Sequence, residues 1–176
     1  VQEALHHQGH AAIFNGLRRK IVGIEPGAGN AEEQVTREKL VSAILDSQLS
    51  DGGWSLSGNA SDADITAMAI QALSPYYSEN TQVKEALDNA LSCLSDLQTA
   101  TGGYLSWGTM NSESCAQVIV ALTSLGIDPH TDSRFIKNGC SALDSLMSFY
   151  IDGGFRHTLD GDLNEMSTEQ GYYALS

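Results

Sequence analysis

The sequence is poor in cysteine, in positive charge and in long hydrophobic runs. Its three cysteines, Cys93, Cys115 and Cys140, are odd in number and show no CxxC spacing. This argues against a disulfide framework or a zinc cluster and predicts small buried residues on helices. Lysine and arginine total 9 against 22 acidic residues, a net charge of −13, which repels nucleic-acid phosphates and anionic lipid. This charge argues against nucleic-acid binding. No run approaches the roughly 18 apolar residues of a membrane-spanning helix, so membrane insertion is not expected.

What the chain does contain is a repeated pattern of helix, turn and helix. Glycine-glycine-aromatic turns begin at Asp51, Thr101 and Asp152, so the spacings are 50 and 51 residues. Each turn is followed by a helical stretch that ends in Ala-Leu. A fixed period near 50 is typical of equivalent units that bury their apolar faces against one another. The period predicts an all-α fold of repeated helical hairpins, in which glycine of the turn ends the first helix of each pair.

These units make up a single repeat domain, residues 1–176. We expect a leading helix at about residues 11–24 and helical pairs at about 38–77, 83–129 and 135–176. The second helix of the first pair is apolar nearly all round, which predicts that it is the buried member of the pair. The leading helix has no partner and Ser176 follows directly on a helical stretch. We therefore expect the chain to be part of a longer protein.

Two of the turns carry a recognisable motif. Residues 48–54 read Gln-Leu-Ser-Asp-Gly-Gly-Trp and residues 98–104 read Gln-Thr-Ala-Thr-Gly-Gly-Tyr. They match the Q-x-x-x-G-x-W pattern called the QW motif, with tyrosine for tryptophan in the second, while the third repeat has Phe149 where glutamine would stand. From about residue 38 onward, the chain resembles the α/α-toroid superfamily of terpenoid cyclases and protein prenyltransferases. The resemblance implies that the hairpins form part of an α/α toroid, a ring of five to seven helical pairs.

A narrower resemblance concerns residues 61–69, Ser-Asp-Ala-Asp-Ile-Thr-Ala-Met-Ala. This stretch is similar to one in bacterial secreted or surface proteins with prenyltransferase-like repeats, and distantly to the helical domain of the vitamin B12 carriers. It implies a non-catalytic extracellular module without a cofactor, which binds a corrinoid, another apolar or planar small molecule, or a protein. A structural spacer or adhesion unit is an alternative. The candidate contact residues are Trp54, Trp107, Asn111, Glu113, Tyr172 and Tyr173.

The same stretch also allows an enzymatic interpretation. It is similar to the D-x-D-D-T-A motif of class II terpene cyclases, which implies that Asp64 is a general acid supported by Asp62, although Ile65 replaces the third acid. The alternative is that Asp64 caps the apolar helix that follows. Glu113 holds the equivalent position of the next repeat. An acid at the same place in two repeats favours the cap over the catalyst.

No metal site is expected. The cysteines do not match the zinc motif of protein prenyltransferases, and no cysteine precedes Glu169-Gln170 as a thioester would require. Residues 160–165 open like a calcium loop, but Glu165 stands where the loop needs glycine. We interpret this segment as a polar solvated loop.

Overall fold

The computed structural model describes residues 35–176, and the chain divides into two units, residues 1–47 and 48–176. In the first unit, α2 (Arg37–Asp46) is capped by Thr36, whose Oγ1 accepts a hydrogen bond from the backbone N–H of Lys39. The leading helix expected at about residues 11–24 lies outside the described residues. Within residues 35–176, no helix is long and apolar enough to cross a membrane.

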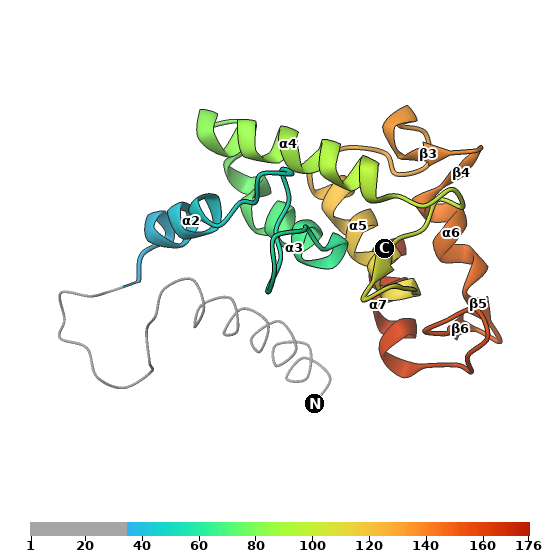
Figure 1. The fold of residues 1–176 in the computed structure, drawn as a ribbon. Coiled ribbons are helices and arrows are strands. Elements are labelled where there is room, and N and C mark those ends of the chain that lie inside the picture. Colours follow the sequence, from blue (N-terminus) through green and yellow to red (C-terminus); the bar gives the residue numbers. More distant parts are fainter. Residues whose placement is uncertain (1–34) are drawn as a thin grey trace. The chain divides into compact units, whose positions relative to one another are not determined.

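The second unit is mostly helical, as the sequence predicts, but three short antiparallel strand pairs interrupt the helices (Figure 1). The fold is therefore not purely all-α. Its elements in chain order are α3 (Ala63–Leu73), η1 (Ser74–Tyr76), α4 (Thr81–Leu97), β1 (Leu105–Ser106), β2 (Thr109–Met110), α5 (Ser112–Ser124), η2 (Ser133–Phe135), β3 (Ile136–Lys137), β4 (Cys140–Ser141), α6 (Ala142–Ser148), β5 (Tyr150–Ile151), β6 (Gly154–Phe155) and α7 (Glu165–Leu175).

The second helices of successive repeats pack side by side. α5 lies against α3 and against α7, while α4 packs on α3 and α6 packs on α5. The central helix α5 buries both small polar and apolar side chains, including Ser114, Ala116 and Leu122, and α3 buries Ala67 and Ile70. The apolar pattern therefore correctly predicts that α3 is a buried helix. The repeats meet through this layer, so the starts of α3, α5 and α7 occupy equivalent positions.

The glycine-glycine turns do not end the preceding helices, contrary to expectation. α4 ends at Leu97, and Gln98 is already extended, four residues before Gly102 with its φ of +80°. The hydrogen bonds of Gln98 explain why the helix ends before the glycines. Its Nε2 donates to the carbonyl of Gly102 and to that of Phe135, both at 2.9 Å, so it closes the turn and ties it to the next repeat. Gln48 makes the equivalent bond to the carbonyl of Gly52 at 2.7 Å.

The aromatic residue after each glycine pair is buried and is held by the following helix. The backbone N–H of Trp54 donates to Oγ1 of Thr66, and that of Phe155 donates to Oγ1 of Thr168, each at 2.9 Å. Both threonines are the fourth residue of their helix, and Cys115 holds that place in α5. The first and third turns are thus fixed to their own second helices.

The strand pairs form tight hairpins that the helical period does not predict. Their turns place Trp107-Gly108, Asn138-Gly139 and Asp152-Gly153 at positive φ, the conformation of two-residue hairpin loops. The hairpin β3–β4 occupies the segment expected to begin the third helical pair, so α6 has only seven residues. It also corrects the expectation for Cys140, which lies half-buried in β4, whereas Cys93 and Cys115 are buried on helices as predicted.

Candidate functional site

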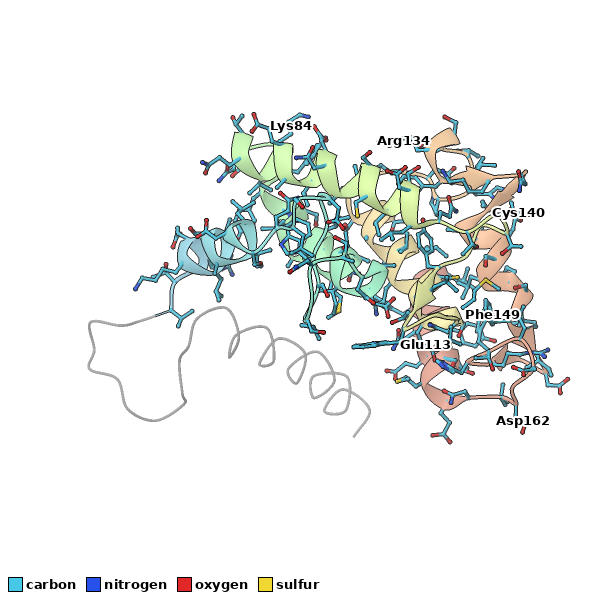
Figure 2. All side chains as sticks on the ribbon, viewed as in Figure 1. Lys84, Glu113, Arg134, Cys140, Phe149 and Asp162 are labelled. Atoms are coloured by element: carbon cyan, nitrogen blue, oxygen red, sulfur yellow. The ribbon has the colours of Figure 1, made fainter. Side chains whose placement is uncertain are left out.

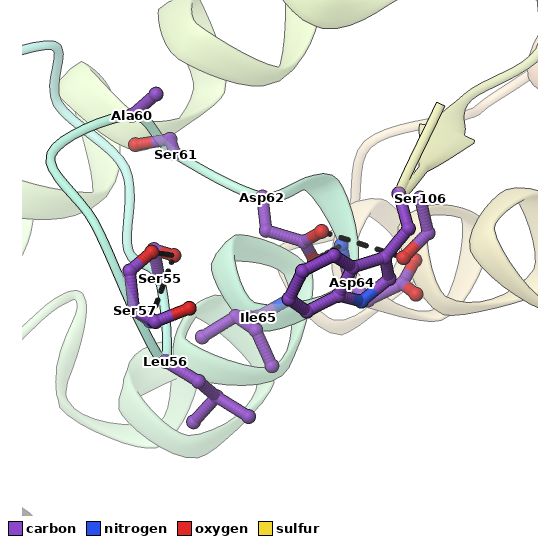
Figure 3. A pocket seen from close by; sticks show the side chains of 10 residues that line it. Ser55, Leu56, Ser57, Ala60, Ser61, Asp62, Asp64, Ile65 and Ser106 are labelled. Atoms are coloured by element: carbon purple, nitrogen blue, oxygen red, sulfur yellow. Dashed lines mark hydrogen bonds between the residues drawn. The ribbon is translucent and has the colours of Figure 1, made fainter. Parts of the chain in front are cut away.

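A hollow of about 290 Å³ lies where the first and second repeats meet. One side is the loop after the first turn, the base is the start of α3, and the other side is the hairpin β1–β2 (Figure 3). In Figure 3, Leu56 stands opposite Ser106, and the labelled side chains of α3 lie between them. The lining residues are Ser55, Leu56, Ser57, Ala60, Ser61, Asp62, Asp64, Ile65, Ser106 and Trp107.

Asp62, not Asp64, caps the helix. Its Oδ1 accepts hydrogen bonds from the backbone N–H groups of Asp64 at 2.9 Å and Ile65 at 3.1 Å, and its Oδ2 accepts one from the hydroxyl of Ser106 at 3.4 Å. The prediction of an aspartate cap was right for the helix and wrong for the residue, because α3 begins at Ala63. Asp64 is the second residue of the helix, so its carboxyl group is free for another role.

The carboxyl group of Asp64 is the least satisfied polar group of the hollow. Its Oδ1 is buried and has no hydrogen-bond partner. Burial raises the pKa of Asp64 above its usual value, and the negative charges of Asp62 and Glu113 raise it further, while the hydroxyls of Ser114 and Ser106 oppose the shift. Asp64 therefore keeps its proton to a higher pH than an ordinary aspartate.

Trp107 is the most exposed large apolar residue of the site, with 89% of its surface accessible. It holds a φ of +53° at the tip of β1–β2, a region that bulky residues avoid. The exposed indole gains almost no hydrophobic burial that could offset this backbone strain. Such strain, next to a hollow, is a typical mark of a functional position.

The other predicted contact residues do not line the hollow. Trp54 is only 2% exposed, so its side chain packs in the core rather than offering a contact surface. Asn111 is buried and caps α5 by accepting from the N–H of Ser114 at 2.8 Å. Tyr172 and Tyr173 are exposed on α7, and the hydroxyl of Tyr172 donates to the carbonyl of Gly153 at 2.9 Å.

Glu113 is buried with 8% exposure and lies at the junction of the second and third repeats (Figure 2). Its Oε1 accepts from the hydroxyl of Ser167 at 2.5 Å, and its Oε2 lies 2.8 Å from Nδ1 of His157. The acid stands between the serine and the histidine, and Ser167 is fully buried. This is not the order of a nucleophile and its base, so the cluster joins α5 to the third repeat.

Sequence reasoning located Asp62 and Asp64 but missed Ser106 and Leu56, which complete the hollow. Ser106 comes to Asp62 from 44 residues away, and the only local signal is the glycine that follows Trp107 in the hairpin turn. Among the described residues, no group of three or more histidine, cysteine, aspartate or glutamate side chains is placed to hold a metal ion.

Comparison with known proteins adds no relative: no family model, no curated protein and no solved structure matches the chain.

Proposed function

We propose that this chain is a non-catalytic ligand-binding module and that the hollow at Asp64 is its binding site. The observation that supports this most directly is the buried Oδ1 of Asp64, which has no partner in the protein. A buried polar atom left unpaired costs about 1–3 kcal/mol. Asp64 lines the hollow, so rotation of its carboxyl group would present this oxygen to a ligand, whose hydrogen bond would recover that free energy. The exposed indole of Trp107 would cover the ligand.

The volume of the hollow limits the size of the ligand. Small-molecule sites usually enclose about 300–1,000 Å³, and this hollow of about 290 Å³ is at the lower limit. It favours a ligand much smaller than a corrinoid. The family resemblance supports the wider setting of the proposal, in which the repeats are part of an α/α toroid in a secreted or surface-exposed bacterial protein.

A second candidate function is general-acid catalysis by Asp64, and the raised pKa of this residue favours it. A cyclase, however, must keep water away from a carbocation, and it does so with an apolar, closed cavity. Five of the ten residues that line the hollow are serines or alanine, and only Leu56, Ile65 and Trp107 are large and apolar. The lining therefore favours binding over cyclisation.

The proposal is tested by screening the chain against a library of cationic, neutral and anionic fragments. Binding is followed by the NMR signals of the Ser106 amide and the Trp107 indole, with Asp64→Ala as the site variant and Asp160→Ala, in an exposed loop, as the matched control. We expect fragments that shift both signals in the wild type and the control but not in Asp64→Ala. A ligand at about 100 times its dissociation constant should also add about 2.7 kcal/mol of stability.

If no fragment shifts these signals, the spacer or adhesion interpretation replaces the binding module. Turnover of an isoprenoid substrate that is lost in Asp64→Asn would instead establish the enzyme.

A further inference from the structure

The repeats contain an internal comparison that identifies the kind of ligand, provided that the hollow is a binding site as proposed above. Asp64 and Glu113 are both the second residue of their helix. Ser114 and Ser167 are both the third residue of the helix that follows in the next repeat. Ser106 and His157 both stand two residues after the buried aromatic of their turn. The two repeat junctions therefore place the same three positions together.

At the second junction all three positions are paired. Ser167 donates to one oxygen of Glu113, and Nδ1 of His157 lies 2.8 Å from the other. The imidazole is half-exposed, while the carboxylate that it contacts is buried. A flat nitrogen-containing ring thus completes this junction, with an N–H directed at the acid.

At the first junction the ring is replaced by a hydroxyl. Ser106 stands at the position of His157, and its hydroxyl donates to Asp62 instead. Asp64 is also one methylene shorter than Glu113. Both Asp64 and Ser106 line the hollow. Because Ser106 is the counterpart of His157, the hollow corresponds to the position that the His157 side chain occupies at the second junction. These two side chains are smaller than their counterparts, which leaves more room beside Asp64 than beside Glu113.

We propose that the hollow binds a planar nitrogen cation, such as an amidinium, guanidinium or imidazolium group, which donates an N–H to Asp64 as His157 does to Glu113. Asp62 adds a second negative charge, and no lysine, arginine or histidine is among the residues that line the hollow. The face of Trp107 at the rim stacks on a flat cation, and Leu56 and Ile65 contact its carbon skeleton.

The test uses benzamidine, a flat amidinium, with neutral benzamide and anionic benzoate of the same shape as controls. Each compound is titrated into the full chain, and the amide signals of Ser106 and Trp107 are followed by NMR. We expect saturable shifts with benzamidine and none with the two controls. Asp64→Asn should weaken benzamidine about tenfold or more, because the charged partner is lost.

Two substitutions exchange the residues that stand at the equivalent position of the two junctions, Ser106 and His157. Ser106→His should also abolish benzamidine binding, because the new imidazole occupies the site and contacts Asp64. His157→Ser should create a second benzamidine site, detected at the amides of Ser112 and Ser167. These variants keep the buried core unchanged, and a dispersed NMR spectrum verifies that each one is folded.

Two results would overturn the inference: benzamide binding as well as benzamidine, or benzamidine affinity unchanged in both Asp64→Asn and Ser106→His. If neutral or anionic fragments bind at Ser106 while benzamidine does not, the proposed binding module is supported and the proposed preference for a planar cation is wrong. If nothing binds there, both proposals fail.

Discussion

At the scale of single residues, Asp62 and Asp64 are separated by one residue in the sequence but differ in what they contribute to the fold. Asp62 satisfies two backbone N–H groups at the start of α3. We expect Asp62→Ala to lower the free energy of unfolding by about 1 kcal/mol, and Asp62→Asn to lower it much less, because asparagine also caps helices. Urea denaturation of the three proteins measures the difference. Equal losses for both substitutions would contradict the capping role.

Asp64 should instead make stability depend on pH. Its pKa is raised in the folded protein, so the folded state holds this proton more tightly than the unfolded state. The resulting stabilisation is present below the unfolded pKa and is lost as the pH rises through the folded pKa. Asparagine does not titrate. Relative to the wild type, Asp64→Asn should therefore gain stability as the pH rises from the ordinary aspartate pKa through the raised pKa of Asp64, as measured by urea unfolding from acidic to neutral pH. A constant difference would show that Asp64 does not titrate as described.

At the scale of elements, the hairpin β1–β2 carries a strained tryptophan that the fold does not need. A bulky residue at positive φ costs about 1–3 kcal/mol, and Asn-Gly is the favoured sequence for this turn. We expect Trp107→Asn to raise the free energy of unfolding by about 1 kcal/mol. Trp107→Ala is the control, since it removes the indole but keeps a side chain that disfavours the turn. Comparable stabilities of the two variants would mean that the backbone is not strained.

The elements also show what the sequence can and cannot predict. The period of 50 residues correctly predicts the helices α3, α4, α5 and α7, because each has an apolar pattern of its own. It does not predict the hairpins, whose formation depends on local turn pairs such as Asn138-Gly139. The acids of the hollow stood out through their motif. Ser106 did not, because its role depends on a contact with a different repeat.

At the scale of the whole molecule, the junction at Glu113 joins the second repeat to the third. His157→Ala removes one partner of a buried carboxylate that keeps its bond to Ser167, and we expect it to cost about 1 kcal/mol. Adding Glu113→Gln should recover part of that loss, because an amide is less costly to bury unpaired than a charge. A double-mutant cycle in urea isolates the coupling between the two residues. A coupling of zero would show that the junction does not depend on this pair.

The two tryptophans of the sequence have opposite environments, and this has a spectroscopic consequence. Trp54 is enclosed in the core and Trp107 stands in solvent at the rim of the hollow. Their fluorescence should therefore separate by wavelength, with the emission maximum of Trp54 at shorter wavelength than that of Trp107. A quencher dissolved in water should reach Trp107 alone. The protein thus carries one optical reporter for its core and another for its rim, and neither requires a label.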